Sequence, residues 1–252
     1  MAEARQHILI TGASAGIGEA LARILAPDAR ISALARRTDR LSSLSSEHEH
    51  ITGYQADVAS FDSAKQAVSR AVAESGPVDM LILNAGIYQP VSAEEFDAEI
   101  YRKHMDINYM GVINLLELVI KDMIAAKQGH IVIMASVAGY RGLPRSAAYG
   151  PTKSALQNLS ESLYFDLKPA GVKIQLVNPG FVETEATSVN DFKMPGLISA
   201  HKAAEEIKKG ISSDRFEIAF PRGFVWYMKM LSLLPYSVYL RLVAKLTGVD
   251  KP

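Results

Sequence analysis

The sequence contains no cysteine, and it has no excess of charge of either sign. Its 252 residues include 27 Lys and Arg against 27 Asp and Glu. Without cysteine, a disulfide scaffold and thiolate metal sites are excluded. The balanced charge disfavours a protein that binds nucleic acid through a basic surface. With 48% hydrophobic residues, the chain can still bury a substantial core.

Long hydrophobic runs are also missing. The longest stretch without Asp, Glu, Lys or Arg is Met80–Ala93, which contains Pro90, whereas a membrane-spanning helix needs about 20 apolar residues. At the N-terminus, Glu3 precedes a short apolar run that leads directly into a glycine-rich turn, unlike a secretory signal peptide. We therefore expect a cytoplasmic protein without a transmembrane segment.

Short apolar runs alternate with longer helical patterns along the chain. The predicted strands are His7–Thr11, Arg30–Ala35, Ile51–Gln55, Met80–Asn84, His130–Ala135, Lys173–Asn178 and Glu217–Phe220. The predicted helices are Gly16–Leu25, Phe61–Glu74, Phe96–Ala126, Tyr149–Leu167 and His201–Ile211. This alternation predicts an α/β protein with a Rossmann-like, doubly wound, seven-stranded parallel sheet and helices on both faces. No linker marks a second domain, so we expect a single domain over residues 1–252.

Two segments break the alternation. Residues 179–196 have no clear period and follow the end of a strand, which predicts a lid at about residues 181–200. The tail, at about residues 222–248, predicts two short amphipathic helices, Phe224–Met230 and Tyr236–Leu246, separated by Pro235. Its apolar residues fit three alternatives: closing a substrate pocket, forming a subunit contact, or resting on a membrane surface.

A glycine-rich turn joins the first strand to the first helix. Glycines allow a tight turn and a close approach of backbone N–H groups to a pyrophosphate, and the helix N-terminus behind them favours negative charge. We therefore predict a dinucleotide-binding turn that includes Gly12, Ser14, Gly16, Ile17 and Gly18.

The end of the second strand predicts the choice of cofactor. NAD-binding chains place Asp or Glu here to accept a hydrogen bond from the ribose 2′-hydroxyl, but this chain has Arg36 and Arg37. Guanidinium groups suit a phosphate by charge and geometry. The two residues therefore favour NADP(H) over NAD(H); the alternative is that they only begin a solvated helix.

Two further strand ends carry candidate cofactor contacts. Asp57 and Val58 follow the third strand, where a carboxylate can accept a hydrogen bond from adenine; the alternative for Asp57 is a helix N-cap. Asn84, Ala85 and Gly86 follow the fourth strand, where small residues let the backbone run beneath a cofactor. The alternative there is a plain turn from strand to loop.

A second group of residues indicates proton transfer. Tyr149 and Lys153 lie four residues apart and share one helix face. A nearby ammonium is expected to lower the pKa of a phenol and make it a usable acid or base. Ser136 ends the fifth strand and can hydrogen-bond a substrate oxygen. Asn108 lies within a long predicted helix, where its amide either holds a water next to Lys153 or marks a kink.

Together these motifs resemble the short-chain dehydrogenase/reductase family in its short single-domain form. The resemblance runs from about Ile8 to Phe220 and adds the motif Pro179-Gly180. It implies a catalytic tetrad of Asn108, Ser136, Tyr149 and Lys153. Tyr149 would be the acid/base, Lys153 would bind the nicotinamide ribose, Ser136 would orient the carbonyl, and Asn108 would anchor a relay water.

The resemblance also implies cofactor contacts from the segment after the sixth strand. These are Pro179, Gly180, Val182 and Thr184. One departure is visible: Leu83 stands where the family often has a second Asn before Asn84.

The function expected from these residues is hydride transfer between NADP(H) and a carbonyl or alcohol. Apolar residues in the predicted lid, namely Phe181, Phe192, Met194 and Leu197, favour a lipophilic substrate. No metal is expected, and the resemblance implies a homodimer or homotetramer. The alternatives are a protein acting mainly as an alcohol dehydrogenase and an NADP-binding sensor or scaffold without turnover.

Overall fold

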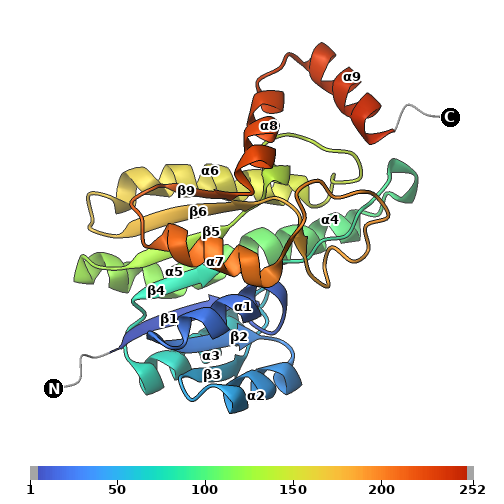
Figure 1. Cartoon of the computed structure of the whole chain (residues 1–252). Helices are drawn as coiled ribbons and strands as arrows, with labels where there is room; N and C mark the ends of the chain where they lie inside the picture. Colours follow the sequence, from blue (N-terminus) through green and yellow to red (C-terminus); the bar gives the residue numbers. More distant parts are fainter. Residues whose placement is uncertain (1–4, 249–252) are drawn as a thin grey trace.

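The computed structural model describes residues 5–248 and is built around a seven-stranded sheet in which all paired strands are parallel (Figure 1). The strand order is β3-β2-β1-β4-β5-β6-β9. The strands are β1 (Gln6–Thr11), β2 (Ala29–Ala35), β3 (Ile51–Gln55), β4 (Met80–Leu83), β5 (His130–Met134), β6 (Lys173–Pro179) and β9 (Glu217–Phe220). The strand order reverses direction between β1 and β4, so the predicted Rossmann-like, doubly wound sheet is confirmed.

Helices cover both faces of this sheet (Figure 1). The longer ones are α1 (Gly16–Leu25), α2 (Thr38–Glu47), α3 (Phe61–Ser75), α4 (Ala98–Met105), α5 (Gly111–Ala126), α6 (Gly150–Leu167), α7 (Ala200–Ile211), α8 (Arg222–Ser232) and α9 (Tyr236–Thr247). Short helical turns are η1 (Ala93–Glu95), η2 (Asp106–Met110) and η3 (Val137–Gly139). A separate pair of short strands joins β7 (Val182–Glu183) to β8 (Ile198–Ser199).

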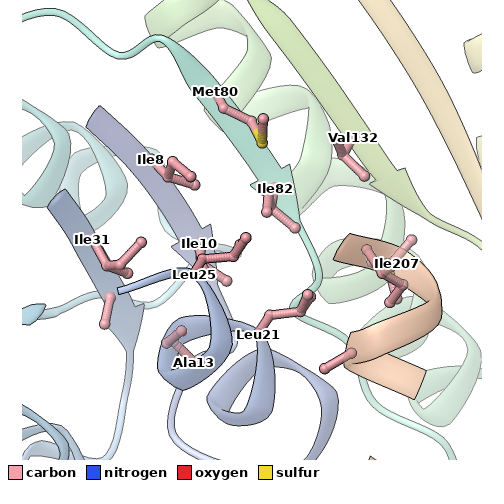
Figure 2. Packing of buried hydrophobic residues seen from close by; sticks show 14 of the residues in the cluster. Ile8, Ile10, Ala13, Leu21, Leu25, Ile31, Met80, Ile82, Val132 and Ile207 are labelled. Atoms are coloured by element: carbon pink, nitrogen blue, oxygen red, sulfur yellow. The ribbon is translucent and has the colours of Figure 1, made fainter. Parts of the chain in front are cut away.

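The alternation of side chains along β1 produces a core on each face of the sheet. Ile8 and Ile10 belong to one buried cluster, together with Leu21 of α1 and Ile207 of α7 (Figure 2). Leu9 points the other way, into a cluster that includes residues of α3, α5 and α6. Each fully buried Leu or Ile stabilises the fold by about 1.5–3 kcal/mol. These two cores fix the strand ends that carry the candidate site.

Two sequence predictions about helices were wrong. Residues 38–47 form α2, which is absent from the predicted helices. The inward face of α2 carries little besides Leu41 and Leu44, so the helical period is weak. The predicted helix Phe96–Ala126 is interrupted, because η2 is a turn of π-helix between α4 and α5. The extra residue of a π-turn changes which side chains face inward, and such turns are frequent at functional sites.

The predicted tail helices are present as α8 and α9, which lie beyond the end of β9 (Figure 1). Their inner faces pack with Val137, and Arg141 holds the connection between them. The Arg141 guanidinium donates to the backbone oxygen of Ser232, 3.0 Å away, and stacks over the Tyr239 ring, 4.0 Å from its centroid.

Candidate active site

A large cavity lies at the carboxyl ends of the strands, where doubly wound sheets bind ligands. Its volume is about 1060 Å³. Most of the predicted site residues line it, although they come from segments far apart in the sequence: Gly12, Ser14, Gly16, Ile17, Arg36, Arg37, Asp57, Val58, Asn84, Ala85, Gly86, Ser136, Tyr149, Lys153, Pro179, Gly180, Val182 and Thr184. The cavity therefore joins the predicted cofactor contacts to the candidate reacting residues.

The glycine-rich turn brings the N-terminus of α1 to this cavity. Gly16 has a φ of +56°, and Ala15 at the N-cap provides no side-chain hydrogen bond to the first turn of the helix. An alanine cannot cap these N–H groups, which leaves them available to an anionic ligand. The turn therefore fits the pyrophosphate of a dinucleotide.

Gly18 was predicted to contact the cofactor, but it lies behind the turn and does not line the cavity. A Cβ atom here would be 2.3 Å from the Gly12 carbonyl oxygen and 2.5 Å from Nδ2 of Asn84. Gly18 therefore permits close packing of α1 against the turn instead of touching the ligand.

Asn84 fixes the shape of the same turn. Its Nδ2 donates to the backbone oxygens of Thr11, at 3.0 Å, and Gly12, at 3.3 Å. The Thr11 hydroxyl accepts from the backbone N–H groups of Asn84 and Ala85, both at 3.0 Å. The ends of β1 and β4 are thus tied together. Leu83, the departure noted above, is buried in the core and leaves this arrangement intact.

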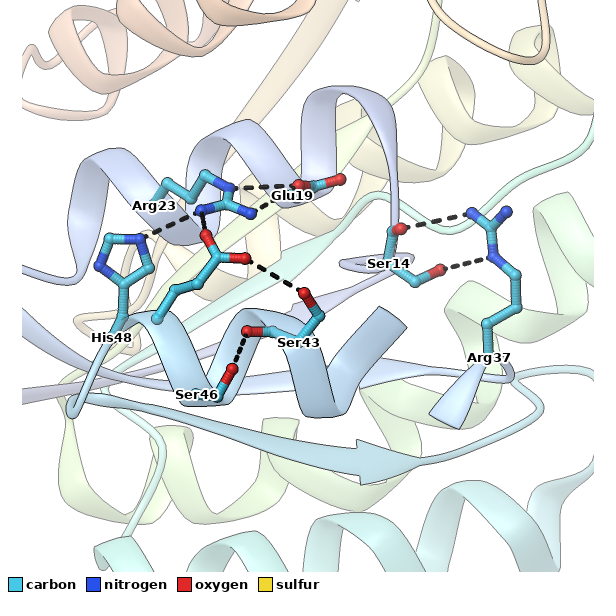
Figure 3. A network of polar contacts seen from close by, with 8 residues as sticks. Ser14, Glu19, Arg23, Arg37, Ser43, Ser46 and His48 are labelled. Carbon is cyan, nitrogen blue, oxygen red and sulfur yellow. Dashed lines mark hydrogen bonds and ion pairs between the residues drawn. The ribbon is translucent and has the colours of Figure 1, made fainter. Parts of the chain in front are cut away.

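The two arginines after β2 have different surroundings. Nε of Arg37 donates to the Ser14 hydroxyl at 3.2 Å, and its Nη2 donates to the Ser14 backbone oxygen (Figure 3). Arg37 also forms an ion pair with Glu185 at 2.8 Å. Among residues 5–248, Arg36 has no acidic partner within ion-pair distance, and it is exposed at the cavity edge. Arg36 is therefore the cation better placed to meet a phosphate.

Asp57 and Val58 form the wall near these arginines. Oδ1 of Asp57 accepts from the backbone N–H of Ala59 at 3.0 Å, which closes a small turn. The N-cap of α3 is Ser60, whose hydroxyl accepts from Ser63 N. Asp57 is thus not the N-cap of this helix, and it remains partly exposed at the cavity.

Tyr149 and Lys153 share one wall of the cavity. Nζ of Lys153 lies 5.5 Å from the centroid of the Tyr149 ring and donates to the backbone oxygen of Met134 at 2.8 Å. Burial lowers the pKa of Lys153 to about 8. Burial also raises the pKa of Tyr149 to about 12, while the Ser136 hydroxyl acts in the opposite direction.

The expected lowering of the Tyr149 pKa by Lys153 was therefore wrong for the protein's own groups. Desolvation disfavours the phenolate, and this effect is larger than the stabilisation that the surrounding protein provides. At neutral pH, Tyr149 accordingly carries its proton and can act as an acid.

Asn108 was predicted either to hold a water beside Lys153 or to mark a kink, and its side-chain polar atoms bind the protein. Its Oδ1 accepts from the backbone N–H of Ile87 at 2.7 Å, and its Nδ2 donates to the Ile87 oxygen and to Oγ1 of Thr152, at 3.0 and 3.1 Å. Thr152 in turn donates to the backbone oxygen of Tyr149 at 2.7 Å. Asn108 does not line the cavity. It is a buried bridge between the segment after β4 and the start of α6.

Ser136 lines the cavity at the end of β5, and its hydroxyl accepts from Ala138 N at 3.1 Å. Sequence reasoning missed the residue that supports it. Gln157 donates from Nε2 to the Ser136 backbone oxygen, at 2.9 Å, and to Oδ1 of Asn178. A glutamine on the same helix face as Lys153, four residues later, is the signal that could have revealed it.

The segment of the predicted lid lines part of the cavity. Thr187 organises its first turn, because its hydroxyl donates to the Val182 oxygen at 2.7 Å and accepts from Thr184 N at 3.1 Å. Farther along, Asp191 pairs with Arg145 at 3.2 Å. The pair between Asp191 and Arg145 connects this segment to another residue that lines the cavity.

An aromatic cluster forms the remaining wall, and sequence reasoning found only part of it. Tyr88 packs edge to face on Tyr149, with ring centroids 5.1 Å apart, and donates to Oδ1 of Asn190. Of the four predicted apolar lid residues, only Phe181 and Phe192 line the cavity. Met194 and Leu197 do not, so that part of the prediction was wrong. Further apolar lining comes from Leu143, Phe224, Tyr227, Met228, Leu231, Val243 and Leu246.

Comparison with known proteins agrees with this geometry. A family model described as short chain dehydrogenase matches residues 6–193. An uncharacterised oxidoreductase of Myxococcus xanthus is 35% identical over 236 residues, which cover 92% of this chain and 93% of that protein. The chain therefore belongs to the short-chain dehydrogenase family, and it is an oxidoreductase of that family.

Solved structures support the same assignment of fold. A short-chain dehydrogenase from Streptomyces avermitilis has a TM-score of 0.84 and 24% identity, with 99% of this chain and 100% of that chain covered. An alcohol dehydrogenase from the archaeon Thermococcus sibiricus, in complex with 5-hydroxy-NADP, has a TM-score of 0.78 and 25% identity. In that comparison, 86% of this chain and 96% of the other are covered.

Proposed function

We propose that this protein is an NADP(H)-dependent oxidoreductase that reduces a lipophilic ketone or aldehyde to an alcohol. The observation that carries the proposal is the position of Ser136, Tyr149 and Lys153 on one wall of the cavity that also contains the predicted cofactor contacts. NADP(H), when bound there, supplies the hydride in reduction or accepts it in oxidation.

The protein's own residues would provide position and the proton. The Ser136 hydroxyl would hydrogen-bond the substrate carbonyl oxygen, and Tyr149 would donate its phenolic proton to that oxygen as negative charge develops. Lys153, held against β5 by the Met134 carbonyl, would stabilise the phenolate that remains. Asn108 would act as a positioning residue, because it connects Ile87 to Thr152 and thereby to the Tyr149 backbone.

The state of the phenol suits the reductive direction of this reaction. Burial raises the pKa of Tyr149 to about 12, so the protonated form, which is the acid required for carbonyl reduction, predominates at neutral pH. The net direction depends on the ratio of reduced to oxidised cofactor, because one site catalyses both directions, so the same site acting mainly as an alcohol dehydrogenase stays an alternative.

The preference for NADP(H) rests on charge. Arg36 and Arg37 stand where an NAD-binding chain would have a carboxylate, and both line the cavity. The Thermococcus sibiricus relative, which is in complex with an NADP derivative, is consistent with this preference.

The preference for a lipophilic substrate rests on the wall opposite the cofactor contacts. This wall is formed largely by aromatic and aliphatic side chains from the lid segment, α8 and α9. Burial of apolar substrate surface against them would provide most of the binding free energy.

The proposal is tested by Tyr149→Phe, which removes the phenolic proton and keeps the ring. We expect kcat for carbonyl reduction to fall by about 10²- to 10⁴-fold, with NADPH affinity unchanged in a fluorescence titration. The matched control is Tyr88→Phe, which removes a neighbouring hydroxyl that donates to Asn190 and should leave kcat within a small factor of the original. Retention of most activity by Tyr149→Phe would refute the proposed role. If the unaltered protein binds NADPH but reduces no member of a graded panel of carbonyl compounds, a sensor or scaffold would be favoured instead.

A further inference from the structure

The outer faces of α8 and α9 are apolar, although their inner faces already pack against the protein. Val225, Met228 and Leu231 form the buried side of α8. On its outer side, Trp226 is 67% exposed and Leu233, which follows the helix, is 77% exposed. On α9 and at its start, the exposed apolar side chains that do not line the cavity are Tyr236, Val238 and Leu240. Large exposed apolar side chains gathered on two neighbouring helices are typical of an interaction site.

The helices α8 and α9 and the turn between them, called the α8–α9 hairpin below, carry charged side chains of positive sign only. From the residue after Glu217 to the residue before Asp250, the sequence contains no Asp or Glu. Lys229 pairs with Glu217, but Arg222, Arg241 and Lys245 are exposed and, among residues 5–248, have no acidic partner within ion-pair distance. The whole chain has a net charge of +0, so acidic residues in the rest of the chain balance the positive charge of the hairpin.

We infer that the α8–α9 hairpin is a docking surface for an anionic lipid bilayer. Tryptophan and tyrosine favour the boundary between headgroups and acyl chains, and lysine and arginine are attracted to anionic headgroups. The hairpin combines both chemistries on helices that are held in place. Arg141 fixes the turn between the two helices, and the Tyr239 hydroxyl donates to the Gly142 oxygen at 2.7 Å.

A second copy of the chain fits this surface less well. In a two-fold dimer the same patch meets itself, which would place Arg222, Arg241 and Lys245 of both copies in one interface without acidic partners from the hairpin. Anionic headgroups neutralise the same cations. Within residues 5–248, every helix is too short or too polar to cross a bilayer, so the contact would be peripheral.

The experiment measures sedimentation of the full chain with vesicles of phosphatidylcholine alone and of an equal mixture of phosphatidylcholine and phosphatidylserine. We expect binding to the mixed vesicles, and we expect that binding to weaken between about 0.1 M and about 1 M salt as the Debye length shortens. Binding that is no stronger to the mixed vesicles than to phosphatidylcholine alone would overturn the inference.

Two variants with two substitutions each test whether the α8–α9 hairpin is the part of the protein that contacts the vesicle. Arg241→Gln with Lys245→Gln should weaken binding by about tenfold or more, because each basic residue near an anionic surface contributes about fivefold. The matched control is Lys65→Gln with Lys121→Gln, two exposed lysines of α3 and α5. If both double variants lose vesicle binding equally, the assignment of the α8–α9 hairpin as the docking surface is contradicted.

Trp226→Ser with Leu233→Ser should also abolish most vesicle binding, and neither residue lines the cavity. Phe165→Ser on α6, where the side chain is 75% exposed, is its control. Circular dichroism and NADPH titration report whether each variant is folded. If sedimentation velocity without lipid shows that the unaltered protein is a dimer and that the Trp226 and Leu233 variant is a monomer, the surface joins two copies of the chain and the inference is wrong. None of these readouts depends on the proposed reaction.

Discussion

Arg36 and Arg37 are adjacent in the sequence, yet the structure gives their side chains different surroundings. Arg37 is engaged by Ser14 and by Glu185 of the lid segment, whereas Arg36 is exposed at the edge of the cavity. A guanidinium group already engaged by a carboxylate must exchange that partner before it can bind a phosphate. The cofactor preference should therefore depend more on Arg36.

Substitution Arg36→Gln tests this difference between the two residues. We expect KM for NADPH to rise by about tenfold to a hundredfold, because a charge-assisted contact to phosphate is lost, while KM for NADH changes little. The measurement is steady-state kinetics with both cofactors. Arg102→Gln, on exposed α4, is the control. An equal rise for NADPH and NADH would argue against contact with the 2′-phosphate.

At the scale of secondary-structure elements, the π-turn η2 is the least predictable part of the site. The sequence identified Asn108 as unusual for a helix interior, but the change of helix type depends on contacts with distant backbone. Asn108 has three hydrogen bonds to Ile87 and Thr152. These contacts join the segment after β4 to α6, which carries Tyr149 and Lys153.

Substitution Asn108→Ala should lower the free energy of unfolding by about 2–4 kcal/mol, since it leaves buried backbone and hydroxyl groups without partners. Activity should fall as well, because the start of α6 loses its support. Chemical denaturation provides the measurement. Asn114→Ala is the control, as it removes a single bond to the Val58 oxygen and should cost about 1 kcal/mol. Similar losses for the two variants would show that Asn108 is not a bridge.

Strands were predicted more accurately than helices, for a physical reason. The predicted boundaries of Ile51–Gln55 and Glu217–Phe220 agree with the structure, and each of the other five predicted strands differs from it by one residue at one end. Buried parallel strands are short continuous apolar runs, which local sequence reveals. In contrast, α2 has mainly serine and charged side chains and was missed.

For the site, the sequence indicated which residues gather at the strand ends, but it did not indicate which of them line the cavity and which lie behind its wall. Gly18 was grouped with the cofactor contacts and Asn108 with the catalytic residues, and neither lines the cavity. Tyr88 and Gln157 were missed because their importance comes from tertiary contacts: Tyr88 packs on Tyr149, and Gln157 donates a hydrogen bond to the Ser136 backbone oxygen. Motif spacing contains no information about such contacts between distant segments.

At the scale of the whole molecule, one sheet supports the entire site, and the single-domain organisation of residues 1–252 stays a prediction. Stability of this sheet should depend on pH through His130, which is buried at the start of β5. Its Nε2 lies 2.8 Å from Oε1 of Gln175. Burial, with the nearby charge of Lys173, lowers the pKa of His130 to about 4.

Below its ordinary pKa of about 6.5, a histidine in the unfolded chain takes up a proton that folded His130 does not. Stability should therefore fall as the pH falls from about 6.5 to about 4, with a contribution of about 3 kcal/mol. The variant His130→Gln, which cannot titrate, should lose less stability over this interval in urea denaturation. His201→Gln, at an exposed position on α7, should behave like the unaltered protein. If the free energy of unfolding depends on pH in the same way for all three proteins, His130 is not the source of the pH dependence.

The parallel arrangement of the sheet has a practical consequence for handling the protein. Every residue of the candidate site lies toward the carboxyl ends of the strands, whereas the turns before β4, β5 and β6, such as the exposed Lys127 ahead of β5, lie at the opposite edge. Attachment of a biotin or a sensor-chip linker at that edge would present the cavity and the α8–α9 hairpin to solution in one uniform orientation.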